Sequence, residues 1–417
     1  MKYCARCLFP ANHPLNILFG QDGVCSGCRV HEEKDVLDWR LRFEKLKRIV
    51  EPYKDSNRTI NNCIVPVSGA RDSYFIVHLV KNVLGLNPLL VTYNKHYNTL
   101  IGIRNLSYLK TLFGCPLFSM PVNPDRVKRI TYETIKLMGS IYWHCIAGQT
   151  VFPVQIACRF KIPLIIWGVH QGVDQVGMFS HLDEVEMTRK YRKEHDLMGY
   201  EAEDLIGIGS LREDDLHNYI YPHDKELEVV GVRGIYLNNY IRWDSKTQHE
   251  TMIGLYGYET MRLQRTFDTY NDVDCHHYSG LHDLIKYIKW GYGKATDHAS
   301  REIRLKRMTR AEGIDLVKKY SDVWPKDTDL FLKWMDFSSK KDFFRILDRF
   351  RSDAIWERKG DGWKLIDSMI NYKGAEGDAG VALEKTENCI FNDGSKRVKG
   401  MEIDDYTLIG RGWVDDY

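Results

Sequence analysis

The sequence lacks several features that would place it in a common class of protein. No apolar stretch reaches the ~20 residues that a membrane-spanning helix requires, and the start Met-Lys-Tyr-Cys is unlike a signal peptide. The formal charge is only +2 over 417 residues, so the basic footprint of a nucleic-acid-binding protein is missing. There is no low-complexity segment or internal repeat, and aromatic residues at 12% argue against disorder. We therefore expect a globular enzyme of the reducing cytoplasm, with no membrane span and no nucleic-acid partner.

Four of the ten cysteines form two close pairs. Cys4 and Cys7 are followed by Cys25 and Cys28, at a separation within the range of zinc ribbons. Disulfides are the weaker alternative in a reducing compartment, and a redox pair is more often a single C-x-x-C beside a βαβ unit. The pattern predicts one structural zinc ion held by these four thiolates. The other six cysteines lack paired spacing and are mostly expected to be small buried hydrophobes: Cys63, Cys115, Cys145, Cys158, Cys275 and Cys389.

An anion-binding loop is predicted between residues 62 and 85. The apolar strand 63–67 leads into a small polar loop, residues 68–73, and then into an amphipathic helix that Gly85 is placed to end. Free backbone N–H groups and the positive end of the helix dipole point into such a loop, which favours phosphate. The G-x-x-x-x-G-K-[ST] loop is absent, and Asp72 occupies the centre instead. An acid beside phosphates implies Mg²⁺ between them.

The segment Pro66-Val-Ser-Gly-Ala-Arg-Asp-Ser73 resembles the PP-loop of ATP pyrophosphatases, usually written Ser-Gly-Gly-x-Asp-Ser. The resemblance implies cleavage of ATP between its α and β phosphates, transfer of AMP to a carbonyl-type oxygen, and displacement of AMP by a nitrogen or sulfur nucleophile. Ala70 replaces a glycine of the motif, which costs about 1–2 kcal/mol if its φ is positive, and Arg71 replaces the common lysine. An ordinary strand-to-helix turn is the alternative. The implied ATP-binding residues are Ser68, Gly69, Ala70, Arg71, Asp72, Ser73 and Thr92, with Arg71 and Asp72 catalytic and Asp72 also holding Mg²⁺.

Strands and helices alternate along the first half of the chain. We expect strands at 63–67, 88–93, 116–122 and 162–168, and helices at 99–113, 126–138, 279–289 and 299–320. This rhythm predicts an α/β fold with a parallel, doubly wound sheet of the HUP-like PP-loop type. Residues just after Val67, Thr92 and Trp167 should then line one crevice. The expected divisions are a zinc ribbon (1–30), a helical linker (31–57), a PP-loop domain (58–226) and a helix-rich region for substrate and partner binding (227–417).

Three further segments resemble the N-acetyl sugar amidotransferase family: Asn98–Leu106, the strand end Ile166-Trp167-Gly168, and Gly291–Arg304 followed by Met308-Thr309-Arg310. With the ribbon, this resemblance covers nearly the whole chain. Members of the family are similar to enzymes of bacterial surface-polysaccharide (O-antigen) synthesis that turn the acetamido group of a nucleotide-activated sugar into an acetamidino group. The resemblance implies that a glutaminase and a barrel-shaped partner supply ammonia, both similar to the two subunits of imidazole glycerol phosphate synthase. Whether the chain also forms a homo-oligomer is left open.

Weaker candidates for substrate binding rest on position. One group follows the strand end at Gly168, where a plain turn is the alternative: His170, Gln171 and Asp174. A second group lies in the family-like segment and offers donors to a nucleotide-sugar diphosphate, although a helix-cap role is an alternative for Asp297: Lys294, Asp297, His298 and Arg301. Arg104 and Asn105 could reach either ligand. The stretch 180–195 and the basic run 301–307 are both typical of solvated helix faces.

An acetamide carbonyl is a poor electrophile toward ammonia, so its oxygen must first become a leaving group such as AMP. We therefore expect an ATP-dependent amidotransferase. A tRNA thiolation enzyme is one alternative, but it needs a basic RNA face and a reactive cysteine pair, and nothing stands out beyond Cys145 and Cys158. A degenerate nucleotide-binding scaffold that docks the ammonia-producing partners is the other, motivated by Ala70 and Arg71. No cysteine lies in a recognisable nucleophile elbow, so nitrogen is expected to come from outside the chain.

Overall fold

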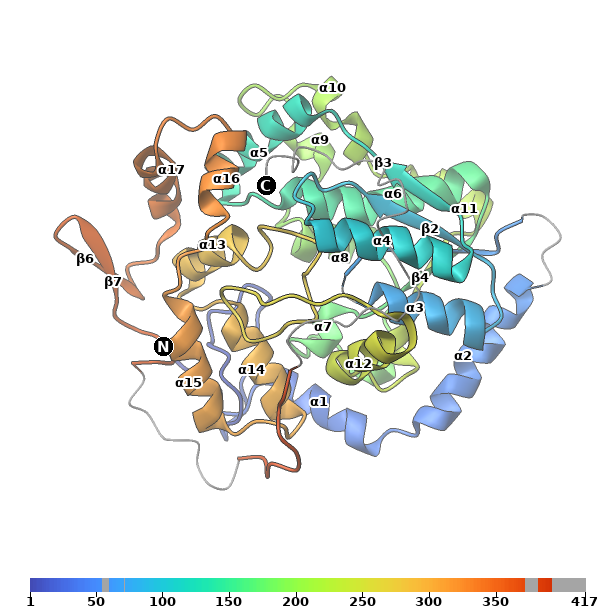
Figure 1. The fold of residues 1–417 in the computed structure, drawn as a ribbon, viewed down its shortest axis with the longest axis horizontal. Coiled ribbons are helices and arrows are strands. Elements are labelled where there is room, and N and C mark those ends of the chain that lie inside the picture. The colour runs from blue at the N-terminus through green and yellow to red at the C-terminus, as the bar shows by residue number, and fades with distance from the viewer. Residues whose placement is uncertain (55–59, 71, 372–381, 392–417) are drawn as a thin grey trace.

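The computed structural model describes residues 1–54, 60–70, 72–371 and 382–391. A central parallel sheet carries helices on both faces, and the C-terminal helices gather on one side of it (Figure 1). The N-terminal ribbon leads into α1 (Ser26–Val36) and α2 (Trp39–Lys54), which curve beneath the sheet in this view. Among the described residues, no helix is both long and apolar enough to cross a membrane.

Five parallel strands form the sheet in the order β3-β2-β1-β4-β5. Ile64 of β1 lies opposite Leu89 of β2 on one side and Ile165 of β4 on the other. The chain therefore moves outward from β1 in one direction for β2 and β3, and in the other for β4 and β5. In such sheets the reversal opens a crevice at the carboxyl ends of the two central strands. The strands are β1 (Cys63–Pro66), β2 (Pro88–Tyr93), β3 (Leu117–Met120), β4 (Leu164–Trp167) and β5 (Arg233–Tyr236).

Alternate strand residues enter two separate cores. Ile64 and Ile165 pack in one core with α5 (Pro124–Met138) and α6 (Trp143–Phe160). Val65 and Ile166 pack in the other core, with α2 and a group of helices on the opposite face. Because side chains alternate along a strand, the two faces of one short apolar strand supply both cores. That second group comprises α3 (Ser73–His78), which continues into the π-helical turn η1 (Leu79–Val83), α4 (Leu100–Phe113) and α12 (Ser245–Tyr256).

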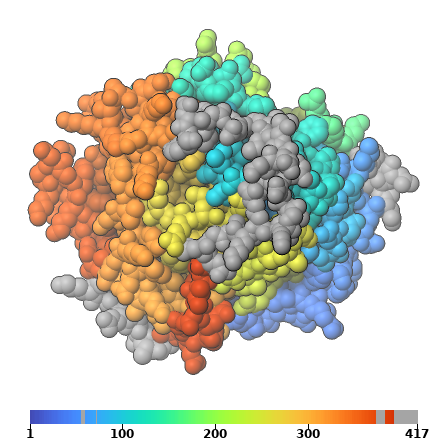
Figure 2. Space-filling model, in the orientation of Figure 1, coloured from blue at the N-terminus to red at the C-terminus, as the bar shows by residue number. Residues whose placement is uncertain are grey.

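Some of the C-terminal helices share the first of these cores, and the others pack on the ribbon, where Ala299, Ile303 and Val317 cluster with Tyr3 and Leu8. Leu281, Phe331 and Phe343 belong to the same apolar cluster as Ile64. In Figure 2 the orange C-terminal helices lie against the yellow segment that follows α12. The elements are α13 (Leu281–Trp290), α14 (Lys294–Arg304), α15 (Arg310–Ser321), α16 (Thr328–Trp334), α17 (Lys340–Leu347), η6 (Asp348–Phe350) and the hairpin β6 (Trp356–Lys359) and β7 (Gly362–Leu365).

Short helical turns connect β4 to β5 at the β5 edge of the sheet. They are α7 (Gln171–Asp174), η2 (His181–Asp183), α8 (Arg189–Tyr191), η3 (Arg192–Asp196), α9 (Ala202–Leu205), α10 (Glu213–Leu216), η4 (His217–Tyr219) and α11 (Asp224–Val230), and η5 (Leu237–Asn239) follows β5. The sheet thus reaches Tyr236, ten residues beyond the predicted end of the PP-loop domain at 226. The four divisions 1–30, 31–57, 58–226 and 227–417 themselves stay predictions.

Several expected helices differ in the structure. The helix expected at 299–320 is two helices, because Lys306 has a φ of 61° and Thr309 starts α15 with a capping box to Glu312. The solvated helix expected at 180–195 is wrong, since the stretch forms separate short turns and buries Tyr191 and Arg192. Helix α6 was not expected. Its sequence contains Gly148 and Pro153, which interrupt the helical pattern.

The contact between α6 and β2 leads to a stability prediction. A Cβ on Gly148 would overlap the ring of Tyr93, whose hydroxyl is fixed by His144 Nδ1 at 3.0 Å and the hydroxyl of Tyr219 at 2.7 Å. We expect Gly148→Ala to lower the free energy of unfolding by about 1–3 kcal/mol. The matched control is Gly254→Ala in α12, where a Cβ meets nothing within 4 Å and should add about 0.5–1 kcal/mol. Urea denaturation measures both, and equal effects of the two substitutions would contradict the packing described.

Candidate functional site

The loop between β1 and α3 is curled by its own hydroxyl groups. The Ser73 hydroxyl accepts a hydrogen bond from the Ser68 backbone N–H at 3.1 Å and donates to the Ala70 carbonyl at 2.7 Å. Within the described part of the loop, the left-handed φ angles belong to Gly69 (82°) and Asp72 (39°). Ala70 is therefore free of the strain that a positive φ would impose. Arg71 lies outside the described residues.

Gly69 is required where the loop meets α4. A Cβ on Gly69 would overlap the Gly102 carbonyl oxygen and lie 3.0 Å from Cβ of Leu106. A side chain at this position would therefore push the loop away from the helix that backs it. The close approach explains why the motif has glycine here, in addition to the positive φ.

Asp72 contacts a histidine that the sequence did not point to. The Asp72 backbone N–H donates to Nε2 of His249 at 3.2 Å, and Nδ1 of His249 lies 2.6 Å from the Ser245 carbonyl oxygen. The bond to the carbonyl fixes the proton on Nδ1 and leaves Nε2 as the acceptor. A carboxylate oxygen of Asp72 is 3.9 Å from the same Nε2. His249 lies on α12, far along the chain, so no local pattern could have linked it to the loop.

One cavity of about 570 Å³ opens at the carboxyl ends of the strands. Ser68 after β1, Tyr93 at the end of β2 and Gly168 after β4 all line it, as the parallel sheet predicts. Tyr236 of β5 extends the floor. The opposite wall comes from α13, α14 and the ribbon, which contributes Phe9 and His13. Residues far apart in the sequence thus line one cavity.

Most of the site residues predicted from the sequence meet at this cavity. The predicted residues that line it are Ser68, Asp72, Ser73, His170, Gln171, Asp174, Lys294, Asp297, His298 and Arg301. Thr92 is buried in β2 and is not part of the lining, which takes Val91 and Tyr93 instead. Arg104 and Asn105 also lie outside it. Arg104 forms a two-pronged pair with Glu259 at 2.7 and 3.1 Å, and the Asn105 side chain bonds to the Glu259 backbone.

The basic residues of α14 are already paired with carboxylates. Nζ of Lys294 lies 2.6 Å from Asp272, and the Arg301 guanidinium lies 2.7 Å from Asp268 and from Glu302. Burial opposes ionisation of Asp268, but His298 and Arg301 hold its pKa well below the usual value. A diphosphate would therefore have to compete with carboxylates for these cations. The paired network positions α14 against the cavity.

The expected solvated face at 301–307 is wrong. Arg304 and Arg307 are 5% and 3% exposed. Arg307 pairs with Asp244 at 2.7 Å and with Glu302 at 2.6 Å. Because Arg307 pairs with carboxylates and Arg304 donates to the Gln175 carbonyl oxygen, a run that is basic in sequence lies largely buried in the fold.

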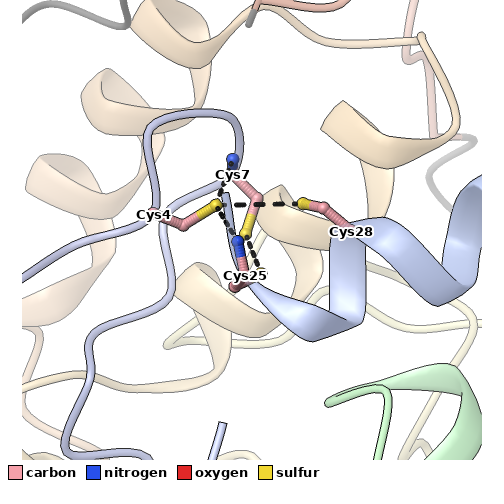
Figure 3. Close-up of side chains that lie close together, drawn as sticks. All are labelled: Cys4, Cys7, Cys25 and Cys28. Atoms are coloured by element: carbon pink, nitrogen blue, oxygen red, sulfur yellow. Dashed lines mark hydrogen bonds between the residues drawn. The ribbon is translucent and has the colours of Figure 1, made fainter. Parts of the chain in front are cut away.

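The four paired cysteines converge in the ribbon, with Cys28 on the first turn of α1 and Cys4 and Cys7 on the facing loop (Figure 3). All four side chains are buried, and their sulfur atoms lie within 4.8 Å of one another. Backbone N–H groups of Arg6, Cys7 and Cys25 point at the Cys4 sulfur at 3.3 to 3.4 Å. Such N–H donors stabilise thiolates, so the cluster can bind a metal ion such as zinc.

Arg304 connects this cluster to the cavity wall. Its guanidinium lies 3.5 Å from the Cys25 sulfur and donates to the Gln175 carbonyl oxygen at 2.7 Å. Gln175 follows α7 and lines the cavity. A Cβ on Gly27 would overlap Arg304, so the ribbon and α14 fit closely at this point.

Comparisons with known proteins add a family for the C-terminal part. Residues 264–370 match the family model described as LPS biosynthesis protein WbpG-like, C-terminal domain. This part of the chain is similar to that family's C-terminal domain, and we call it the WbpG-like domain. It supplies α13 and α14 to the cavity wall. The match supports the resemblance to N-acetyl sugar amidotransferases that the sequence motifs indicate.

Other comparisons contribute less. The search of curated proteins gave no match. Among solved structures, the chain is similar to the NH3-dependent NAD synthetase from Campylobacter jejuni, solved in complex with nitrate, at 14% identity and a TM-score of 0.26. That likeness covers 46% of this chain and 92% of the synthetase. Because the TM-score is low, no argument rests on it.

Proposed function

We propose that the protein is an ATP-dependent amidotransferase of bacterial surface-polysaccharide (O-antigen) synthesis. It adenylates the acetamido oxygen of a nucleotide-activated sugar and replaces that oxygen with ammonia to give an acetamidino group. The observation that carries the proposal is one cavity lined both by the loop between β1 and α3 and by the WbpG-like domain. The loop is suited to ATP, and the matched family gives the polysaccharide context.

In the first step the loop holds the triphosphate of ATP. Ser68 and Ser73, which line the cavity, would face the departing pyrophosphate, with Arg71 as the proposed cation. Asp72 is the proposed ligand of Mg²⁺, which would neutralise the developing phosphate charge when bound. The acetamido oxygen attacks the α-phosphorus, and pyrophosphate leaves. No side-chain nucleophile is needed, because position and charge provide the acceleration.

In the second step ammonia attacks the carbon that now carries AMP. The C–O bond to AMP breaks, and the electron pair leaves with AMP. Residues of the WbpG-like domain, Lys294 and Asp297 among them, would orient the sugar so that its acetamido group reaches the loop. Ammonia would come from a glutaminase and a barrel-shaped partner. His170, Gln171, Asp174, His298 and Arg301 are further proposed contacts.

The ribbon has a structural role in this proposal. Four thiolates close a tetrahedron and leave no open position for a substrate, so Cys4, Cys7, Cys25 and Cys28 would hold zinc for folding rather than for chemistry. The zinc would keep Arg304 in place against Gln175. The tRNA thiolation alternative loses support, since burial raises the pKa of the Cys145 thiol and makes a reactive thiolate unfavourable.

Removal of the Asp72 charge should abolish AMP formation. Asp72→Asn keeps the size and the tolerance of a left-handed φ, so the fold should be retained. We expect AMP and pyrophosphate formation to fall by about 100-fold or more. The matched control is Asp353→Asn, an exposed acid far from the cavity in sequence. A parental rate in Asp72→Asn would mean that this carboxylate does not act on ATP.

Freshly purified protein should contain one zinc ion per chain. Cys28→Ser should lose most of this zinc and several kcal/mol of stability, because metal binding and folding of the ribbon are coupled. Cys158→Ser, at a partly exposed cysteine outside the cluster, should retain both. Elemental analysis and thermal melts measure the two effects. Absence of zinc from the parent protein would refute the assignment.

The source of nitrogen provides the test of the whole reaction. The isolated chain, with ATP and a panel of nucleotide sugars bearing acetamido groups, should form product with ammonium at alkaline pH, where free ammonia is abundant. It should fail with glutamine, and added glutaminase and barrel partners should restore glutamine use. Mass spectrometry detects the exchange of O for NH. Glutamine-dependent product from this chain alone would require an amidohydrolase site that the proposal lacks.

A further inference from the structure

An aromatic niche lies at the β4–β5 end of the cavity. Its rings come from three segments: His170 follows β4, Tyr191 and His195 lie on α8 and η3, and Tyr236 ends β5. The His170 ring centroid lies 4.2 Å from that of Tyr191 and 4.7 Å from that of Tyr236. The carboxyl group of Asp196, at the end of η3, completes this group. We call these five residues the Asp196 niche.

Asp196 differs from most of the other acids of the cavity. Asp174 pairs with Lys34, Asp272 with Lys294, and Asp297 with Lys286. Within the part of the chain that the structure describes, the Asp196 carboxyl has no hydrogen bond and no cation within 4.0 Å. Arg192, one turn away, is held by Glu201 and by the Thr150 hydroxyl. Asp196 is partly exposed and lines the cavity, so its unpaired carboxyl is open to a ligand that supplies positive charge.

The chemistry of the niche fits a small cation. A carboxylate attracts a positive charge directly, and the faces of tyrosine rings attract it through their quadrupoles. The niche is also close to the loop between β1 and α3. Because β1, β4 and β5 are adjacent strands spaced about 4.8 Å apart, the end of β5 lies roughly 10 Å across the sheet from the loop after β1.

The proposed reaction needs such a group. Near neutral pH the available nitrogen is mostly ammonium, which has no lone pair to attack with, so a base must take one proton. His170 is a poor base here, since burial lowers its pKa to about 4. Asp196 is better matched, because burial raises its pKa to about 7, partly opposed by Arg192.

We propose that the Asp196 niche binds ammonium and that the Asp196 carboxylate takes the proton that converts it to ammonia. The proposal rests on the amidotransferase function above. One N–H bond of ammonium breaks, and the proton moves to a carboxylate oxygen of Asp196. The freed lone pair forms the C–N bond to the adenylated carbon, and the C–O bond to AMP breaks with its electron pair on AMP. Asp196 returns the proton to solvent after product leaves.

The pH dependence follows from the groups that face Asp196. Tyr191, Arg192 and His195 lie on its own segment, His170 on the loop after β4, and Tyr236 on β5. Burial keeps the pKa values of both tyrosines above the usual value, so they stay neutral. At limiting ammonium, kcat/KM should therefore rise as pH passes through about 7. In Asp196→Asn the rise should move to the higher pH at which ammonium ionises in solution.

The variant is expected to fold. The pKa of Asp196 is raised from its usual 3.8 to about 7 in the folded protein. The folded state therefore loses stability as pH rises between these two values. Asp196→Asn removes the negative charge that this environment disfavours, so the variant should be at least as stable as the parent above pH 7. The matched control is Glu194→Gln, which makes the same charge change at an exposed position on the same segment.

The test separates the two halves of the reaction. Exchange of pyrophosphate into ATP, driven by the nucleotide sugar without ammonium, reports adenylation. Product formation at varied ammonium reports the second half. For Asp196→Asn at pH 7 we expect kcat/KM for ammonium to fall by about 100-fold while exchange continues. Glu194→Gln should match the parent in both. An unchanged kcat/KM for ammonium, or equal losses in both halves, would overturn the proposal.

A binding measurement keeps the test independent of turnover. Ammonium chloride should raise the melting temperature of the parent above the value in potassium chloride at the same concentration, and Asp196→Asn should lose this difference. If no nucleotide sugar supports exchange by the parent, the amidotransferase function fails while this measurement still tests the niche. Equal melting temperatures in the two salts for the parent would overturn the niche as an ammonium site.

Discussion

The reversal of strand order at β1 is the constraint on which the site depends. With β2 on one side of β1 and β4 on the other, the connections that leave β1 and β4 diverge to opposite faces of the sheet. The loop after β1 lies at this reversal, where Ser68, Asp72 and Ser73 line the cavity. Gly69 allows this loop to lie against α4, and His249 from α12 accepts the Asp72 N–H. The place of the proposed nucleotide site at the strand ends thus follows from topology before any substrate is considered.

The opposite wall of the cavity is built from the N-terminal ribbon and from α13 and α14. The ribbon and α14 meet through Arg304, whose donors reach both the cysteine cluster and the Gln175 carbonyl. Buried pairs such as Lys294 with Asp272 keep α14 in register with the segment before α13. A pair of this kind contributes less to stability than to placement, because desolvation offsets much of the attraction. Loss of either partner would leave the other buried and uncompensated, so the wall is sensitive to single substitutions.

The sequence predicted the parts of the fold that local pattern controls. The strand 88–93, the helix 99–113, and the crevice residues Ser68 and Gly168 agree with the structure. Prediction from the sequence failed where contacts between distant segments decide the local structure. Helix α6 forms despite Pro153 because it packs on β1, β2 and β4, and the basic run 301–307 is buried because distant acids pair with it. His249 and Asp196 carry no motif, and only the fold brings His249 to the loop after β1 and Asp196 to the cavity. The roles of Asp72, Arg71 and the other site residues stay predictions, as does zinc.

The most direct test of this account is the crystal structure of the protein with Mg²⁺ and an ATP analogue that cannot be cleaved between its α and β phosphates. The account predicts density for the triphosphate against residues 68–73, a metal ion in contact with the Asp72 carboxylate, and the α-phosphate facing the cavity beneath α14. A nucleotide bound elsewhere, with the loop between β1 and α3 unoccupied at saturating ligand, would contradict it.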